Sequence, residues 1–154
     1  MAARSAGILI YRKRAEGAEV LLVHPGGPFW AKRDAGAWSI PKGEYGDDED
    51  AEAAARREFA EETGWTIGTA LTPLGDVRQK AGKVVTAFAA EGDFDPATLR
   101  SNSFEMEWPP RSGRKATYPE IDRAGWFTLD EAVGKIIEGQ RPLLDRLVEL
   151  LAAG

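Results

Sequence analysis

Apolar residues in the first part of the chain alternate with polar residues in the way that β-strands do. Residues 5–12 (SAGILIYR) and 18–25 (AEVLLVHP) are separated by a short charged segment that ends in a glycine, which predicts a β-hairpin. Residues 25–36 are rich in glycine, proline and charged side chains and predict a loop. Residues 37–41 (AWSIP) then predict a short strand.

The second half of the chain continues the strand pattern. Residues 73–94 predict two strands joined at the glycine-containing tip 80–83 (KAGK). Residues 103–108 (SFEMEW) alternate apolar and acidic side chains, which is the pattern of a half-buried strand. Residues 109–120 (PPRSGRKATYPE) predict a loop, and residues 123–127 (RAGWF) predict a final strand.

Three segments have helical periodicity. The first is residues 51–63, where Asp50 is placed to cap the N-terminus and Gly64 to end the helix. Residues 128–137 predict a second helix, because their first and fourth residues, a threonine and a glutamate, have the spacing of a capping box. Residues 141–152 carry a leucine stripe that should pack on the sheet. The pattern predicts one α/β domain, a mixed β-sheet sandwiched between helices on both faces.

Composition is consistent with one globular domain. The chain has 154 residues, of which 43% are hydrophobic and 29% charged. No apolar run approaches the roughly 20 residues that span a bilayer, and the short apolar segment near the N-terminus lacks a cleavage site, so we expect a cytoplasmic protein without a membrane partner. The net charge of −5 argues against a stable nucleic-acid partner. The sequence leaves the oligomeric state open.

The near absence of sulfur and imidazole ligands narrows the chemistry further. The chain has no cysteine and a single histidine, His24. This excludes disulfides, thiolate metal sites and a cysteine nucleophile. A serine hydrolase would depend on His24 alone, and the sequence has no Gly-x-Ser-x-Gly motif. We expect His24 to be structural, or to lie near the site without taking part in the chemistry.

The helix predicted over residues 51–63 places glutamates on its core-facing side. At about 100° per residue, Glu58 and Glu62 point to the same side as the inward alanines, and Glu61 lies at the edge of that sector. Carboxylates that are partly desolvated need a cation or must stay protonated. One candidate cation is Arg57, one turn before Glu61. The other is a divalent ion such as Mg²⁺ or Mn²⁺, for which clustered carboxylate oxygens are suitable ligands.

The residues around this helix resemble the signature of the Nudix hydrolase family. Gly43, then Glu49 after five residues, then residues 57–65 (REFAEETGW) after seven more match the family's 23-residue box at every fixed position. Trp65 stands where an aliphatic residue is more usual, but it remains apolar and should pack. The resemblance implies a single-domain α/β/α sandwich with a mixed β-sheet over residues 1–154.

The resemblance also assigns roles to the residues of the box. In Nudix enzymes the glutamates of this core hold the catalytic divalent ions, so the implied metal ligands are the side chains of Glu58, Glu61 and Glu62 and the carbonyl of Gly43. Glu49 and Arg57 correspond to a structural pair that orients these ligands. The expected cofactor is Mg²⁺, with Mn²⁺ as the alternative.

The group that takes the proton from the attacking water varies across the family. Within the box Glu58 is the first candidate, and Glu61 belongs to the same catalytic set. Outside it, Glu120 lies just before the strand predicted at residues 123–127, where such a residue commonly occurs in Nudix enzymes. A solvated loop charge would explain Glu120 equally well.

Candidates for substrate binding lie outside the box. The sequence Pro41-Lys42-Gly43 resembles that of diadenosine polyphosphate hydrolases and of some nucleoside triphosphate pyrophosphohydrolases, which suggests that Lys42 contacts a phosphate. Arg78 and Lys83, near the predicted tip 80–83, could line a polyphosphate groove. Tyr118 could stack on a base. Exposure at a turn or packing would explain each of these residues as well.

The resemblance implies Mg²⁺-dependent hydrolysis of a phosphoanhydride bond in a nucleoside diphosphate linked to another group. We expect a dinucleoside polyphosphate or a nucleoside triphosphate as the substrate. The metal offsets the negative charge of the phosphates and makes its bound water easier to deprotonate. The alternative is a Nudix-fold regulatory module that binds a nucleotide without cleaving it, which the intact box disfavours.

Overall fold

A six-stranded mixed sheet forms the centre of the protein in the computed structural model, which describes residues 4–153. The strands of this sheet are β1 (Arg4–Arg14), β2 (Gly17–Pro25), β3 (Lys42–Glu44), β4 (Thr72–Arg78), β5 (Val84–Glu91) and β8 (Ile121–Thr128). Their order is β4-β5-β1-β2-β8, and β3 pairs with β1. Strands β1 and β5 run parallel, whereas the other neighbours are antiparallel.

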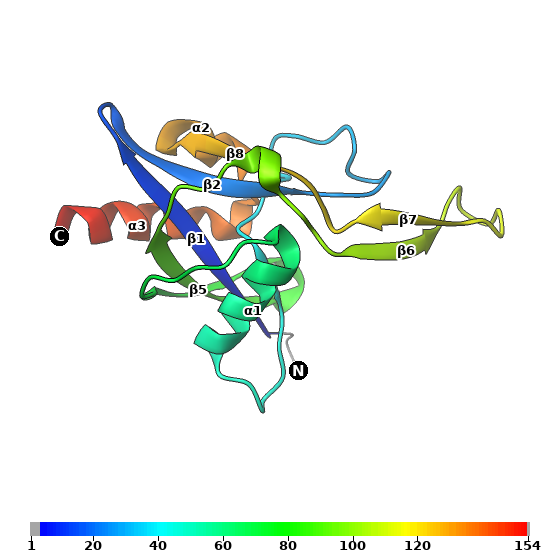
Figure 1. Ribbon diagram of the computed structural model, residues 1–154, viewed down its shortest axis with the longest axis horizontal. Helices are drawn as coiled ribbons and strands as arrows, with labels where there is room; N and C mark the ends of the chain where they lie inside the picture. The colour runs from blue at the N-terminus through cyan, green and yellow to red at the C-terminus, as the bar shows by residue number, and fades with distance from the viewer. Residues whose placement is uncertain (1–3, 154) are drawn as a thin grey trace.

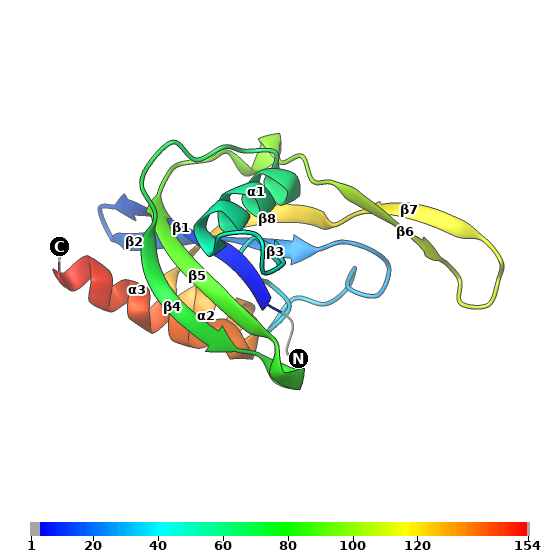
Figure 2. The same ribbon diagram turned by 90° about the horizontal axis from the view of Figure 1, so that it is seen from below.

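Helices cover both faces of this sheet (Figures 1 and 2). Helix α1 (Ala51–Thr63) lies on one face, and helices α2 (Leu129–Lys135) and α3 (Arg141–Ala153) lie on the other. Alternate residues of β1 serve the two sides: Leu9 belongs to the core under α2 and α3, whereas Ile8 and Ile10 belong to the core under α1. The predicted α/β/α sandwich with a mixed sheet is confirmed.

Three short 3-10 turns, η1 (Lys80–Gly82), η2 (Pro96–Thr98) and η3 (Glu138–Gln140), connect the larger elements. Within residues 4–153 no helix is long and apolar enough to cross a membrane. The outermost positions of the domain expected over residues 1–154 lie outside the described residues.

Local sequence signals explain where the helices begin and end. Asp50 caps α1 by accepting a hydrogen bond from the backbone N–H of Ala53 at 3.2 Å, and Gly64 ends it in the left-handed conformation, with φ of 78°. The capping box predicted for α2 is present, with both of its hydrogen bonds formed. The leucine stripe of α3 is buried at Leu143 and Leu147, as the periodicity predicts.

The main difference from the prediction is a second, two-stranded sheet. Strand β6 (Ser103–Glu107) pairs with β7 (Lys115–Pro119), which lies within the segment predicted to be a loop. The turn residues of that segment occupy only its first part, and the alternation that follows extends β6 into a hairpin, with Phe104 opposite Tyr118. Figures 1 and 2 show this arm projecting from the body of the protein.

Two smaller expectations were wrong. The strand predicted at residues 37–41 forms only isolated bridges, Ser39 with Val23 and Trp38 with Ile136, and the adjacent regular strand is β3. The second helix ends earlier than predicted, because Ile136 is extended, with ψ of 147°, and its N–H bonds to Ala132. Ile136 is fully buried, so packing in the core overrides helical continuation there.

Candidate functional site

Helix α1 is held on the sheet by small and aromatic side chains, and this places its glutamates at the edge of the core. Ala54, Ala55 and Phe59 are buried against β1 and its neighbours. On the same side, the Glu58 side chain is only 13% exposed, whereas that of Glu61 is 44% exposed. The structure therefore agrees with the helical projection, with Glu58 inward and Glu61 at the margin.

Arg57 is the hub of an ion-pair network with three glutamates. Its Nε and Nη2 donate to the two carboxylate oxygens of Glu49, each at 2.8 Å. Its Nη1 donates to Glu58 Oε1 at 2.7 Å and lies 3.3 Å from both oxygens of Glu61. The bidentate pair lowers the pKa of Glu49 below its usual value. Glu49 in the loop before α1 thus fixes the guanidinium that orients the other two carboxylates.

Glu58 and Glu62 both reach the first residues of β3. A side chain on Gly43 would place its Cβ 1.9 Å from Glu58 Oε2, so the carboxylate occupies the space that the glycine leaves open. The backbone N–H of Lys42 donates to Glu62 Oε1 at 3.1 Å. Residues 42–43 and the inward face of α1 therefore form one small cluster of oxygen-bearing groups.

Burial sets the electrostatics of this cluster. Desolvation, with smaller contributions from the nearby charges of Glu58 and Glu120, raises the pKa of Glu62 to about 8 against the opposing effect of Lys42. Burial also raises the pKa of Glu58, although Arg57 opposes the shift. The pKa of Lys42 is lowered, chiefly because its ammonium group is desolvated.

The side chains of this cluster are of a kind that binds divalent cations. Among residues 4–153, no three histidine or acidic side chains are already gathered closely enough to form a metal centre. The donors are nevertheless hard carboxylate oxygens, and the raised pKa of Glu62 means that the protein supplies too little positive charge to keep this buried carboxyl ionised at neutral pH. A bound Mg²⁺ or Mn²⁺ would supply that charge.

A cavity of about 200 Å³ opens beside the cluster. Lys42, Glu62 and Glu120 contribute its charged lining, and residues such as Trp30 and Ile40 contribute its apolar lining. Glu120 stands at the junction of β7 and β8, where its N–H donates to the Asn102 carbonyl at 2.8 Å and its carbonyl accepts from Gly26 at 2.9 Å. The fold thus brings Glu120, distant in sequence, to the same cavity as Glu62.

The other candidates for substrate binding, Arg78, Lys83 and Tyr118, lie outside the 200 Å³ cavity. Lys83 is close enough to Lys42 for its charge to help lower the pKa of Lys42. Arg78, at the end of β4, is exposed, and neither it nor Lys83 lines the 200 Å³ cavity. Tyr118 is in β7 rather than in a loop, and its ring lies 6.1 Å from that of Phe104. Tyr118 therefore supports the arm from the side of β7.

His24 is a structural residue, in line with the first of its two expected placements. The side chain is fully buried, with Nδ1 2.8 Å from Asp122 Oδ1 and Nε2 2.6 Å from the Arg33 carbonyl. These contacts tie β2 to the start of β8 and to the loop that follows β2. His24 does not line the 200 Å³ cavity.

Sequence reasoning missed Gln140, which supports the approach to the site. This fully buried side chain accepts from the Ile40 N–H at 3.0 Å and donates to Ser39 Oγ at 3.0 Å and Gln79 Oε1 at 2.9 Å. It therefore holds the chain just before Lys42. Nothing in the local sequence distinguishes it from an ordinary polar residue between two helical segments.

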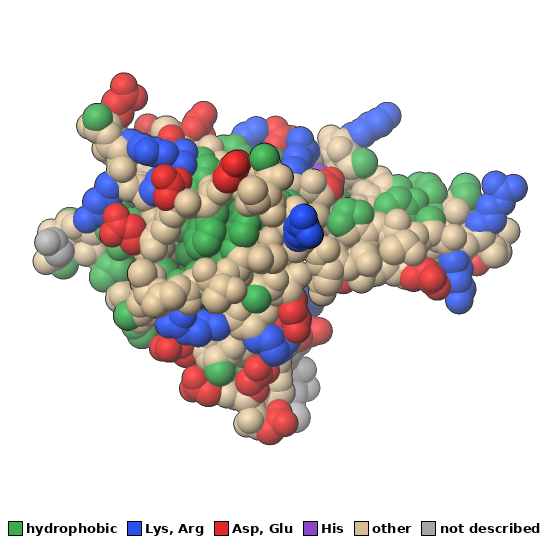
Figure 3. All heavy atoms as spheres, in the orientation of Figure 1, with side chains coloured by type: hydrophobic (Ala, Val, Ile, Leu, Met, Phe, Trp, Pro, Cys, Tyr) green, Lys and Arg blue, Asp and Glu red, His purple; other side chains and the backbone are tan. Residues whose placement is uncertain are grey.

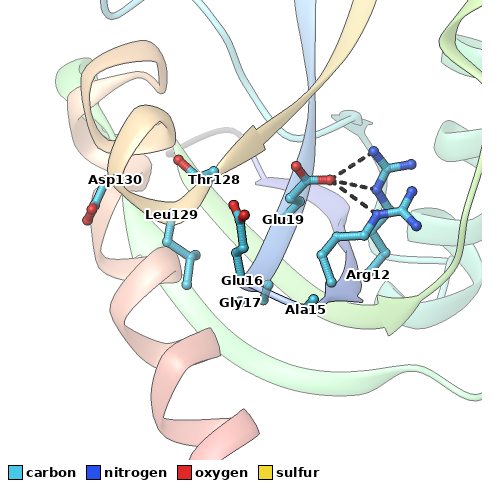
Figure 4. Close-up of a pocket in the computed structure, with 10 residues that line it drawn as sticks. Arg12, Ala15, Glu16, Gly17, Glu19, Thr128, Leu129 and Asp130 are labelled. Carbon is cyan, nitrogen blue, oxygen red and sulfur yellow. Dashed lines mark hydrogen bonds and ion pairs between the residues drawn. The ribbon is translucent and has the colours of Figure 1, made fainter.

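Another cavity, of about 590 Å³, lies away from this cluster beside the β1–β2 turn (Figure 4). In Figure 4, dashed lines join the Glu19 carboxylate to neighbouring guanidinium nitrogens, and Arg12 is 2.8 Å from Glu19 and 2.7 Å from Asp93. Arg14 also approaches Glu19, at 3.6 Å. Because both arginines are already paired with carboxylates, this cavity is a poor site for a phosphate.

Comparison with known proteins finds the same fold elsewhere. The family model described as NUDIX domain matches residues 1–147. The structure resembles the Ap4A hydrolase of C. elegans in a binary complex, with 26% identity and a TM-score of 0.68, covering 97% of this chain and 99% of that chain. A search of curated proteins found no significant match.

Two further solved structures share the fold at lower identity. The NUDIX domain of Shewanella oneidensis NrtR, complexed with ADP ribose, is 17% identical with a TM-score of 0.65, covering 98% of this chain and 89% of that chain. The MutT protein from Methanosarcina mazei Go1 is 22% identical with a TM-score of 0.64, covering 97% of this chain and 95% of that chain.

Proposed function

The chain belongs to the NUDIX domain family, and from this premise we propose that it is a Mg²⁺-dependent pyrophosphohydrolase acting on a dinucleoside polyphosphate or a nucleoside triphosphate. The reaction breaks a phosphoanhydride bond in a nucleoside diphosphate linked to another group. We propose that residues 1–154 form this one catalytic domain.

One observation carries the proposal. Two inward carboxylates, Glu58 and Glu62, meet Lys42 and Gly43 at the start of β3 beside a cavity, and burial raises the pKa of Glu62 to about 8. A soluble protein gains nothing in stability from a carboxyl that burial forces into its neutral form. The arrangement becomes favourable when a cation binds there, and clusters of this kind occur at functional sites.

The proposed metal ligands are the side chains of Glu58, Glu61 and Glu62, together with the Gly43 carbonyl. When bound, a divalent ion would offset the charge of the phosphates and acidify a water molecule. Arg57, fixed by Glu49, holds Glu58 and Glu61 in orientation through the hydrogen bonds described above.

The chain's own groups would manage the proton and the phosphates. Glu120 shares the cavity with Glu62 and is suited to accept the proton of the attacking water, with Glu58 as the alternative base. Lys42 lines the same cavity and can contact a phosphate oxygen, while Lys83 adds positive charge nearby. Arg78 and Tyr118 lie outside that cavity, so we expect them to contact only the distal parts of a long substrate.

The choice of substrate rests on two similarities. The Pro41-Lys42-Gly43 sequence resembles that of diadenosine polyphosphate hydrolases, and the C. elegans structure with 26% identity is an Ap4A hydrolase. The ADP ribose complex of the NrtR domain, at 17% identity, supports only the fold.

A nucleotide panel tests the proposal. The purified chain is incubated with dinucleoside polyphosphates, nucleoside triphosphates, nucleotide sugars and ADP-ribose, with Mg²⁺ or Mn²⁺, and the products are separated by chromatography. Release of a nucleoside phosphate that stops when EDTA is added supports the enzyme. Saturable binding of a nucleotide without turnover, at several pH values and with either metal, would establish the regulatory alternative instead.

A further inference from the structure

A third cavity, of about 410 Å³, lies between the loop that follows β2 and the β6–β7 arm. Its side-chain lining is largely apolar: Phe29 and Trp30 come from the loop, and Phe104 and Met106 come from β6. We call this cavity the aromatic slot. Its volume falls within the range of about 300 to 1,000 Å³ that small-molecule sites occupy. Phe29 is 57% exposed, so core packing does not account for it.

Two glycines press the loop against the base of the arm. A Cβ on Gly26 would lie 2.0 Å from the carbonyl oxygen of Pro119, and one on Gly27 would lie 3.0 Å from the ring of Phe104. Gly27 also has a φ of 98°, which side chains disfavour. The Gly26 N–H donates to the Glu120 carbonyl at 2.9 Å. These contacts hold the loop after β2 against the base of the arm, so the slot between them has a defined shape.

The arm turns its apolar face toward this slot. Phe104 and Met106 are paired across the hairpin with Tyr118 and Ala116, and all four side chains remain half-buried. The intervening residues are charged or polar and exposed. Figure 3 shows apolar side chains gathered along one side of the projecting arm. A two-stranded hairpin gains little stability alone. The apolar face of this hairpin is therefore better explained by a ligand that packs against it.

The slot adjoins the carboxylate cavity. Pro25, Trp30 and Glu120 line both of them, so the apolar cavity and the cavity that contains Glu62 lie side by side, and we call the two together the cleft. The guanidinium carbon of Arg33 lies 4.4 Å from the ring centroid of Phe29, which places a positive charge at the apolar end. The cleft thus offers a flat apolar surface, an adjacent cation and, farther along, the proposed metal ligands.

We propose that the aromatic slot binds the nucleobase of the substrate and that the β6–β7 arm is the element that recognises it. Flat heteroaromatic rings stack on aromatic side chains, and the phosphates attached to such a ring would lie toward Lys42 and Glu62. The inference rests on the proposed function, because it takes the phosphate chain to occupy the carboxylate end of the cleft.

Binding of uncleavable analogues tests the inference independently of turnover. The probes are α,β-methylene diphosphates of adenosine, guanosine, cytidine and uridine, with methylenediphosphonate as the probe without a base, each titrated calorimetrically in Mg²⁺. We expect Phe104→Ala to raise the Kd of the preferred nucleoside analogue at least 10-fold and to leave that of methylenediphosphonate unchanged. Met106→Ala, a smaller change on the same face, should raise it about 3-fold.

Trp108→Ala is the matched control, since Trp108 follows β6 but does not line the slot. It should leave both Kd values unchanged, and near-wild-type melting temperatures would show that all three variants fold. Equal nucleotide affinity in wild type, Phe104→Ala and Met106→Ala overturns the inference. A dimer of the wild type that dissociates in Phe104→Ala, with unchanged nucleotide affinity, also overturns it and assigns the face to a second copy of the chain.

The two proposals fail differently. If the nucleotide panel shows turnover while Phe104→Ala binds its nucleotide normally, the slot assignment is wrong and the enzyme assignment stands. If no substrate is cleaved but Phe104→Ala weakens nucleotide binding, the slot assignment stands and the regulatory alternative gains support.

Discussion

The contact between Gly43 and Glu58 yields the sharpest prediction. In Gly43→Ala, the new Cβ would lie 1.9 Å from Glu58 Oε2, 2.1 Å from Cδ and 2.7 Å from Oε1. Ordinary contact begins near 3.4 Å, so the carboxylate must retreat by about 1.5 Å, and Arg57 already holds Oε1 at 2.7 Å. A displacement of about 1 Å in catalytic geometry costs roughly 100-fold in rate.

We therefore expect Gly43→Ala to lower kcat at least about 100-fold and to weaken Mg²⁺ binding, while the protein still folds. Steady-state hydrolysis of the best nucleotide, with the Mg²⁺ dependence of the rate, measures both effects. Gly68→Ala is the matched control, because a Cβ at Gly68 meets nothing within 4 Å. If Gly43→Ala kept a wild-type rate and wild-type Mg²⁺ dependence, the contact would have no part in the site.

Two further predictions concern stability. In the metal-free protein the pKa of Glu62 is raised to about 8, above the roughly 4.3 of a glutamate in an unfolded chain. Between these two pH values the folded protein binds a proton that the unfolded chain has lost, so the free energy of unfolding falls as pH rises. Melting curves in EDTA should show this decline in stability, and Mg²⁺ should reverse it near pH 8. If the decline persisted in Glu62→Gln, Glu62 would not be the group responsible for it. His24→Ala, which removes a buried ring and two hydrogen bonds, should destabilise the fold by about 2 to 4 kcal/mol in urea unfolding. Val148→Ala, at a position 46% exposed on α3, should change stability by less than about 1 kcal/mol, and equal effects of the two substitutions would contradict the structural role of His24.

Periodicity predicted the elements whose pattern is local. The apolar run of β1, the capped helix α1 and the leucine stripe of α3 are all visible in short windows, because β1 is buried on both faces within the sheet and each helix buries one face against it. The strand β7 was missed because prolines, glycine and arginines precede it, and these residues dominate the signal of the whole segment. The later residues of that segment become a strand because they pair with β6, which is a tertiary effect.

The site shows the same division. The inward direction of Glu58 follows from helix geometry, but its bond to its neighbour Arg57 does not, because adjacent helical residues point in different directions and only the long arginine bridges them. The contact of Gly43 with Glu58 and the approach of Glu120 to Glu62 join segments far apart in sequence. The role of Gln140 could not be predicted for the same reason, since its three hydrogen-bond partners come from segments far from it in sequence.

The central claim is that Glu58 and Glu62 hold the metal on which hydrolysis depends. It is tested most directly by measuring Mg²⁺-dependent turnover of the best nucleotide by wild type, Glu58→Gln, Glu62→Gln and the outward-facing control Glu52→Gln, whose side chain is 48% exposed. The account predicts that both inward variants fold, lose at least about 100-fold in rate and bind Mg²⁺ more weakly, because an amide keeps the shape but not the charge, whereas the control stays near wild type. Near-wild-type, Mg²⁺-dependent rates in both inward variants would contradict it.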